Sequence, residues 1–493
     1  MKPLGTITMY FPYVDDGTRA VLQSVMDEAE NFGDFAERLS SRVCLEATTP
    51  LAEYLASFFA YMLFDYSILD TLESAGKISE MAHPLLLQSK NRRGQMVYWD
   101  EMRQSVHRAI KAAPNDWIAS HLYLLWRIRA EEDFPECDTD VSPIEAITEG
   151  VSEDKDLEYF KVYLLRIQVS HFYRGNIVEE SIDTLNQALV LARKYDDQIM
   201  VAELLTLLAG NIKRVDMKRG IDLLYSAKKL SERLGYSKGL GEVQHQLGLS
   251  MGIRGELDAA IEHHLQSREV FEPISYPTTA VNSLIAYFCN ISGNGDQALE
   301  FVENSLRTID SRRRWVSYAH VQKAWALINL GRYDEAAPEL SEARRLSTLA
   351  GDTATLSVLD LVEGILDKSE KRYDNAVQAF MHVLDTTVAP LWRSICLLNL
   401  TEIEIEMLPR ESLDGNIDSS GPWMKKLDEH TGKNDFPGIV ARSLILKAKL
   451  RQKQGRHDEV RRLLKEVLKM AESPSMRYLK NIVVSTFPDV ILG

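Results

Sequence analysis

The chain has 493 residues, 45% of them hydrophobic and 26% charged, a composition that is typical of soluble proteins and argues against large-scale disorder. Its net charge of −15 argues against general nucleic-acid binding, because proteins that bind nucleic acid usually present a basic surface. The four cysteines are widely separated and form no Cys-x-x-Cys motif, so a zinc or redox site has no support.

Residues 1–130 are expected to form an irregular helical domain that partly resembles the repeats farther along the chain. Helical patterns occupy residues 16–43 and 49–74, residues 98–114 read as a further helix, and a strand-like run is found only at residues 7–14. The most apolar stretch, residues 54–64, is about half a bilayer span and lies between Glu53 and Asp65, so we expect a buried helix and no membrane anchor. The first residues lack the basic start and apolar core of a signal peptide, and a cytoplasmic location is expected.

Acidic residues are concentrated in the segment that follows. Residues 131–160 hold 12 acidic side chains and one basic side chain, Lys155, together with Pro135 and Pro143. We therefore predict an acidic seam at residues 131–157 between the N-terminal domain and a regular array. The array is expected to span residues 158–472, and residues 473–493 are expected to form a capping segment.

A short signature recurs at regular intervals along the array. A turn residue is followed by an acidic residue and then by a small residue that opens a helix, and the period is about 40 residues. The turn residues are Gly255, Gly293, Gly331, Lys371 and Gly455, the last two being separated by two periods. Each unit is predicted to contain a helix A, a tight turn and a helix B. Small residues let the two helices approach closely: Ala260, Ala298, Ala336 and Ala376 on helices B, and Gly248, Ala286, Ala324, Gly364 and Ala448 on helices A. His264 departs from the pattern. At its position the other units carry a large apolar side chain.

This pattern resembles the tetratricopeptide repeat (TPR) family, whose usual unit has about 34 residues. The longer spacing is similar to the roughly 40-residue subtype of MalT-like regulators and kinesin light chains. The resemblance covers residues 158–472. It implies an all-α fold, a right-handed superhelical solenoid of antiparallel helix pairs whose concave wall is formed by helices A.

The resemblance also places particular helix A positions on that wall. In the middle units these positions hold His245, Tyr287, Asn290, Tyr318, Trp325 and Asn329. Aromatic and amide side chains are typical of a groove that binds a peptide. The alternative is that some of them complete the packing between neighbouring units. The Lys and Asn with which some family members grip a terminal carboxylate are absent from the corresponding positions.

The last repeat is basic. Residues 441–480 contain 12 Lys or Arg and 4 Asp or Glu, and six basic residues lie on or next to the final helix A: Arg442, Lys447, Lys449, Arg451, Lys453 and Arg456. One interpretation is a solvated helical end. The other is a docking surface for an acidic partner or for nucleic-acid phosphate, although no interleaved aromatic residues support base stacking.

Enzymatic signatures are absent from the sequence. It contains no Ser-His-Asp pattern, no His-Glu-x-x-His, no P-loop and no dinucleotide-binding glycine motif, so we expect no catalytic, cofactor or metal site. His263 and His264 are adjacent and would point about 100° apart on a helix, which is unsuitable for binding one metal ion. An enzyme site in the N-terminal region, before the regular array begins, remains a third hypothesis.

The leading functional hypothesis is a scaffold or adaptor that binds a protein or peptide in the concave groove. The alternative is a sensor or regulatory module of a signalling or transcription-control system of the MalT-like type. The sequence identifies neither the partner nor the oligomeric state.

Overall fold

The computed structural model describes residues 5–92, apart from 9, 12, 13, 47 and 64, and residues 178–488, apart from 275–277, 308–312, 351, 388, 409–420 and 433–435. Between these ranges it describes only residues 101, 104–106, 108, 109, 158, 159, 161, 162, 165, 166 and 169. The predicted acidic seam at residues 131–157 and most of the predicted helix at residues 98–114 lie outside the described residues. Within the described ranges every regular element is a helix, which confirms the all-α prediction.

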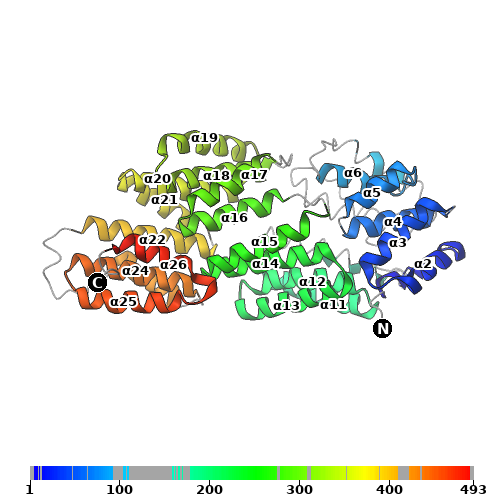
Figure 1. Ribbon diagram of the computed structural model, residues 1–493, viewed down its shortest axis with the longest axis horizontal. Helices are drawn as coiled ribbons and strands as arrows, with labels where there is room; N and C mark the ends of the chain where they lie inside the picture. Colours follow the sequence, from blue (N-terminus) through cyan, green and yellow to red (C-terminus); the bar gives the residue numbers. More distant parts are fainter. Residues whose placement is uncertain are drawn as a thin grey trace. The chain divides into compact units, whose positions relative to one another are not determined.

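The N-terminal helices follow the predicted pattern with one exception. Residues 16–43 and 49–74 each form two helices, separated where Asn31 and Asp65 cap a new helix by accepting a hydrogen bond from its backbone. The strand-like run is wrong for residues 7 and 8, which end a short helix, and Tyr10 packs edge-on against Phe59 at 5.8 Å. The helices are α1 (Gly5–Thr8), α2 (Asp16–Glu28), α3 (Phe32–Leu45), α4 (Pro50–Leu63), α5 (Tyr66–Ser74) and α6 (His83–Arg92) (Figure 1).

The apolar stretch near residue 58 forms the core of this region. Nearly every side chain of α4 is buried, and the rings of Phe32, Phe35 and Phe58 surround Phe59 at centroid distances of 5.4–5.7 Å. In the part of the chain that the structure describes, no helix is long and apolar enough to cross a membrane. The stretch is therefore a buried core helix, as predicted.

The chain divides into two compact units. Unit 1 comprises Met1–Gln246 and Ser267–Pro277, and unit 2 comprises Leu247–Gln266 and Thr278–Gly493. This division falls inside the predicted array, within helices α14 (Ser237–Arg254) and α15 (Leu257–Phe271). The domain boundaries drawn from the sequence remain predictions, since the seam on which they depend is not described.

Unit 1 contains the first helix pairs of the array and a buried ionic cluster. Helices α11 (Val178–Lys194), α12 (Gln198–Ile212) and α13 (Met217–Leu234) pack in succession. Glu203 of α12 is 2% exposed and accepts hydrogen bonds from Arg166, Tyr236 and Lys238, the last with an Nζ–Oε1 distance of 2.6 Å. A buried carboxylate requires such partners, so the cluster joins α12 to Arg166 and to the beginning of α14.

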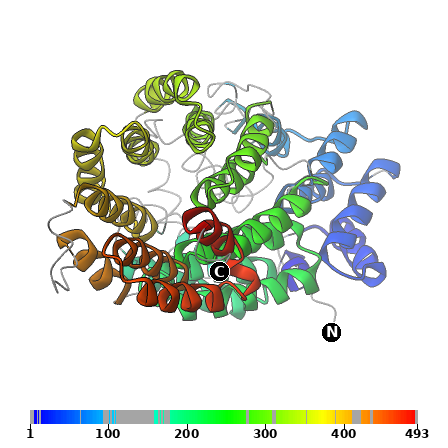
Figure 2. The same ribbon diagram turned by 60° about the vertical axis from the view of Figure 1, so that its left-hand side comes forward.

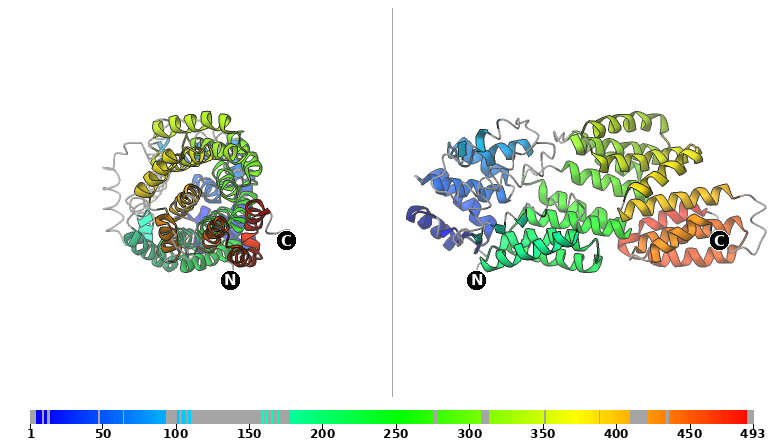
Figure 3. Two further views of the ribbon diagram at one scale, coloured as in Figure 1. Left: turned by 90° about the vertical axis from the view of Figure 1, so that its left-hand side faces the viewer. Right: turned by 180° about the vertical axis from the view of Figure 1, so that it is seen from behind.

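Unit 2 is a row of helix pairs in which, from α16 (Thr279–Ser292) onward, each helix A packs against the next helix A (Figure 2). The row follows a curve (Figure 3). After the second half of α14 and most of α15, its helices are α16 (Thr279–Ser292), α17 (Gly295–Arg307), α18 (Arg313–Asn329), α19 (Tyr333–Ala350), α20 (Thr353–Ser369), α21 (Tyr373–Thr386), α22 (Pro390–Met407), α23 (Pro422–Gly432), α24 (Pro437–Lys453) and α25 (His457–Met470). The even-numbered helices are helices A. A 3₁₀ turn, Pro474–Met476, leads to the last helix, α26 (Tyr478–Thr486).

The turns between helices A and B have the predicted backbone. Gly255 has φ of 77°, a left-handed conformation that glycine adopts without a steric penalty, and the corresponding Lys371 has φ of 62°. Acidic residues occupy the first turn of the helices B that follow, among them Asp258 and Asp374, where they complement the helix dipole. The predicted small residues Ala260, Ala298, Ala336 and Ala376 are fully buried.

The unusual His264 has a simple steric explanation. Its ring is fully buried, and a Cβ atom added at Gly248 would collide with it. The Nδ1 atom lies 2.7 Å from the carbonyl oxygen of Ala260, and the ring centroid lies 5.4 Å from that of Phe288. His264 therefore fills the space that Gly248 leaves open, as Phe380 does opposite Gly364 in a later repeat.

We predict that Ala336→Leu destabilises unit 2 by about 1–3 kcal/mol, because Ala336 is fully buried at a helix A–helix B contact that a larger side chain would overpack. Ala337 is its exposed neighbour on the same helix, so Ala337→Leu should change stability by less than about 0.5 kcal/mol. Urea unfolding followed by circular dichroism measures both changes. Equal midpoints for the two variants would show that the repeat register is wrong.

Candidate binding site

The groove residues predicted from the sequence are distributed over both units. His245 lies on the part of α14 that belongs to unit 1 and is half-buried. The other five, Tyr287, Asn290, Tyr318, Trp325 and Asn329, lie on α16 and α18 in unit 2. The structure brings these five together in one wall of neighbouring helices A.

The two aromatic residues at equivalent positions contact one another and are buried. Tyr287 is 3% exposed and Trp325 is 4% exposed, with ring centroids 5.8 Å apart in an edge-to-face arrangement. Burial also raises the pKa of the Tyr287 hydroxyl well above its ordinary value. Tyr318 is half-buried and lies 6.4 Å from the Tyr287 ring. The geometry of Tyr287 and Trp325 fits the packing alternative, and their role in a groove remains a prediction.

The two asparagines bond to neighbouring helices of the wall. Asn290 Nδ2 donates to the carbonyl oxygen of Gln322 at 2.9 Å, and Asn329 Nδ2 donates to the carbonyl oxygen of Asn290 at 3.0 Å. These bonds connect α16 to α18. The amide donors of these two predicted groove residues are therefore used within the protein in this structure.

We predict that Trp325→Ala lowers the free energy of unfolding by about 3–5 kcal/mol, the usual loss for removing a buried aromatic side chain. Trp315 lies on the same helix and is half-buried, so Trp315→Ala should cost less and serves as the control. Differential scanning calorimetry of both variants measures the difference. A Trp325→Ala protein that melts like the wild type would support the groove alternative.

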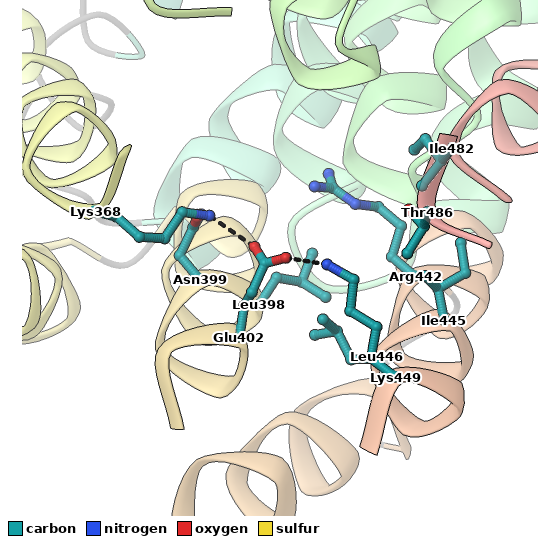
Figure 4. A pocket seen from close by; sticks show the side chains of 10 residues that line it. All are labelled: Lys368, Leu398, Asn399, Glu402, Arg442, Ile445, Leu446, Lys449, Ile482 and Thr486. Atoms are coloured by element: carbon teal, nitrogen blue, oxygen red, sulfur yellow. Dashed lines mark hydrogen bonds and ion pairs between the residues drawn. The ribbon is translucent and has the colours of Figure 1, made fainter. Parts of the chain in front are cut away.

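A polar cavity lies farther along unit 2, on the face formed by its last three helices A. Its volume is about 170 Å³. Figure 4 shows the side chains that line it, which come from α20, α22, α24 and the final helix α26. The lining residues are Lys368, Leu398, Asn399, Glu402, Arg442, Ile445, Leu446, Lys449, Ile482 and Thr486.

A single carboxylate joins two of the cations in this cavity. Glu402 of α22 lies between Lys368 of α20, at an Nζ–Oε2 distance of 2.7 Å, and Lys449 of α24. Lys368 also donates to Asn399 Oδ1 at 2.6 Å. Burial alone would raise the pKa of Glu402, but the two ammonium groups outweigh it and lower the pKa to about 2. Glu402 therefore carries its charge throughout the physiological pH range and links three consecutive repeats.

The third cation, Arg442, is in a different situation. Its Nη1 atom is buried, and none of the described residues offers an acceptor within hydrogen-bond distance. The other basic groups on this helix have partners, as in Lys447 with Asp428 at 2.9 Å and Arg451 with Glu459 at 3.1 Å. Lys453 donates to the carbonyl oxygen of Ile405 at 2.8 Å. Most of the basic charge of the last helix A is thus neutralised or bonded within unit 2.

These residues occupy positions that the sequence pattern could have identified. The predicted groove residues of the middle repeats lie at fixed sequence distances before their turn residues. Arg442 and Lys449 lie at two of the same distances before the turn residue Gly455. Lys368 lies at another of these distances, counted back from Lys371. Extending the register to the last repeat would therefore have found the cavity. Glu402 gave no such signal, because α22 ends at Met407 without the repeated turn signature.

Comparison with known proteins identifies the repeat. The sequence model described as tetratricopeptide repeat matches residues 317–342, which span most of α18 and the first half of α19. The array therefore has a TPR-like solenoid fold, and one of its repeats matches the tetratricopeptide repeat model. No curated protein matches the sequence. The assignment to the MalT-like subtype with the longer repeat remains a prediction.

Among the solved structures found by comparison, the one described first is similar in fold. The structure of a Rap protein complexed with competence and sporulation factor has 14% identity, a TM-score of 0.51, and coverage of 72% of this chain and 98% of that one. Yeast Tom70 has 11% identity, 95% coverage of both chains and a TM-score of 0.34. A signal-transduction ATPase with a TPR sensor from Pyrococcus horikoshii has 12% identity, 90% and 75% coverage and a TM-score of 0.39. At these identities the similarity concerns the fold alone.

The described residues contain no group of three or more His, Cys, Asp or Glu side chains that could hold a metal ion. The main chemical feature of the cavity is the set of cations that line it. They can bind an anion, and with one carboxylate already among them they retain an excess of positive charge.

The depressed pKa of Glu402 predicts a stability change in acid. A folded-state pKa of about 2 lies below the ordinary value near 4.3, so the ionised carboxylate stabilises the fold above that value. This contribution is lost as the pH falls from about 4.3 towards 2. The difference in free energy of unfolding between wild type and Glu402→Gln should therefore be constant above about pH 5 and shrink below it. The exposed Glu466→Gln is the control and should show no such trend in urea titrations.

Proposed function

We propose that this protein is a scaffold or adaptor that binds an acidic segment of a partner polypeptide on the helix A face of unit 2. The observation that carries the proposal is the cavity around Arg442, whose walls come from three consecutive helices A. Concave helix A faces are where the TPR architecture offers an extended binding surface. A cavity between consecutive helices A supports a partner-holding role for this face.

The unsatisfied donor of Arg442 gives the site its affinity for an acceptor. A buried donor that lacks a hydrogen bond costs roughly 1–3 kcal/mol, and a ligand that supplies an acceptor recovers that energy. The planar guanidinium presents parallel N–H groups that match the two oxygens of a carboxylate. An Asp or Glu side chain of the partner is thus a suitable ligand.

The local charge also favours an acidic ligand. Three cations, Lys368, Arg442 and Lys449, line the cavity together with the single carboxylate of Glu402. The chain as a whole has a net charge of −15, so this attraction is restricted to the cavity and does not extend over the surface. Such an arrangement favours an acidic group that reaches the cavity over anions that approach other parts of the surface.

The comparisons support the same class of activity without defining the partner. The Rap structure, the most similar in fold of the three described above, is a complex with competence and sporulation factor. We infer that this chain, with the same kind of fold, also binds a partner and performs no chemistry. The alternative, a sensor module of a signalling system, has no observation of its own among the described residues. A cytoplasmic location remains a prediction.

We predict that Arg442→Ala weakens binding of a fluorescein-labelled octaglutamate peptide about tenfold, because a hydrogen bond to a charged group contributes about 1.5–3 kcal/mol. Arg461→Ala is the matched control, since Arg461 lies on helix B α25, is 66% exposed and pairs with Asp458. Fluorescence anisotropy measures both affinities. An octalysine peptide should not bind in the cavity.

Two outcomes would contradict the proposal. Equal weakening by Arg442→Ala and Arg461→Ala would mean that octaglutamate responds only to overall charge. Unchanged affinity in Arg442→Ala would place the binding face elsewhere on the helices A. Melting curves of both variants must show no loss of stability relative to the wild type, so that weaker binding cannot be attributed to unfolding.

A further inference from the structure

The cavity has a fourth wall that does not belong to a repeat. Ile482 and Thr486 of α26 line it, opposite the helix A residues of α22. Helix α26 packs against α24, α25 and α16, so it lies beside the last repeat and an early helix A of the same unit (Figure 1). Figure 4 shows the Arg442 side chain on the side of the cavity nearest to α26.

The first residue of α26 is anchored to the beginning of unit 2. Tyr478 is 5% exposed, and its hydroxyl donates to the carbonyl oxygen of Gly255 at 2.9 Å. Its backbone N–H donates to Asp258 Oδ2, also at 2.9 Å. Gly255 and Asp258 lie at the turn between α14 and α15, at the opposite end of the unit 2 sequence.

The same carbonyl group is pressed against the last helix A. Gly438 lies in the first turn of α24, and a Cβ atom added at this glycine would collide with the backbone of Gly255. A Cβ added at Gly255 would in turn lie 2.9 Å from Gly438 Cα. Two glycines therefore allow the turn at Gly255 to touch the beginning of α24, and Tyr478 bonds at this junction.

The rest of α26 is held mainly by apolar side chains, including Phe487, which directly follows the helix and is 1% exposed. The helix has nine residues, of which Tyr478, Leu479 and Val483 are buried, and Val484 is 54% exposed. The two side chains that line the cavity, Ile482 and Thr486, are only half-buried. A helix this short is marginal by itself and depends on its docking contacts. Short terminal elements with few buried residues are the ones that open at low free-energy cost.

The size of the cavity limits what it can enclose. At about 170 Å³ it is smaller than the roughly 300–1,000 Å³ of sites that enclose a drug-sized ligand, and a polypeptide segment needs more room than that. Helices α20, α22 and α24 are each packed against a helix B and a neighbouring helix A. Helix α26 is the wall with the fewest constraints.

We propose that α26 is a gate over the Arg442 cavity, held closed at its first residue by the Tyr478–Gly255 hydrogen bond. Displacement of its far end, which carries Ile482 and Thr486, admits an acidic segment to Arg442. The gating of a ligand rests on the proposed function, whereas the opening motion of α26 does not. The two are therefore tested separately.

The first experiment uses the full chain without ligand. Tyr478→Phe removes only the hydroxyl that bonds to Gly255, and the amides of residues 479–487 should exchange with deuterium about fivefold faster than in the wild type, as expected for the loss of about 1 kcal/mol. Tyr225→Phe, at a tyrosine that is 43% exposed in unit 1, is the control and should leave exchange unchanged. Unchanged exchange in Tyr478→Phe would show that α26 is a fixed wall.

The second experiment measures ligand entry. In the double variant Ile445→Cys and Ile482→Cys, both altered positions line the cavity, and a disulfide between them would join α26 to α24. Stopped-flow association of labelled octaglutamate should slow at least tenfold on oxidation and recover on reduction, whereas the single variant Ile482→Cys should be insensitive to oxidant. In Tyr478→Phe the association rate should rise about fivefold.

The outcomes separate the two proposals. Faster exchange in Tyr478→Phe, with no binding of octaglutamate to any variant, would support the opening of α26 and overturn the acidic-ligand proposal. Normal binding with association rates that neither the disulfide nor Tyr478→Phe alters would overturn the gate. If the disulfide fails to form, the exchange rates and the association rate of Tyr478→Phe decide the question.

Discussion

The architecture depends on the close approach of helix A to helix B within each repeat. Ala336 and Ala376 have no exposed surface, and at Gly248 and Gly364 even one added carbon would collide with the facing ring. A larger side chain on either helix would push the pair apart and change the angle at which the next pair stacks. Because each repeat contacts only its neighbours along most of a solenoid, that angle is repeated from pair to pair. The contact of Gly255 with Gly438, far apart in sequence, is thus a cumulative result of short-range packing.

Close stacking has an electrostatic consequence for the polar groups on helices A. Helices that pack side by side exclude water, so each charged group between them needs a partner from a neighbouring repeat. Glu203 in unit 1 and Glu402 in unit 2 meet this requirement in the same way, with cations contributed by other helices of the array. Such pairs define how repeats align, although replacing them by apolar residues could leave stability unchanged. They are structural features of a TPR array and say little about function.

The sequence was informative where structure depends on local spacing and uninformative where it depends on distant contacts. Turn glycines, small helix residues and acidic first turns recur at a fixed period, so the helix pairs could be placed before the structure was known. Burial of Trp325 was not predictable in this way, since the same position in a TPR can face a groove or a neighbouring repeat. The bond from Tyr478 to Gly255 joins residues that no short pattern relates. The misread strand-like run includes Tyr10, whose ring packs on Phe58 and Phe59, and no other strand is available to pair with it among the described residues.

Arg442 differs from the neighbouring basic residues in having a buried donor without a partner in the part of the chain that the structure describes. This difference distinguishes a group that could serve binding from groups that serve stability. A charge that serves only the fold is expected to be paired, as Lys449 is by Glu402, because an unpaired one lowers stability. Arg442 lies on the same helix, two turns away, and its buried Nη1 has no acceptor among the described residues. The fold therefore tolerates a local cost beside a cavity, a pattern characteristic of functional sites. Helix α26 lies against the same cavity and is the least constrained of its walls, so the group that needs a ligand and the element that can admit one are adjacent.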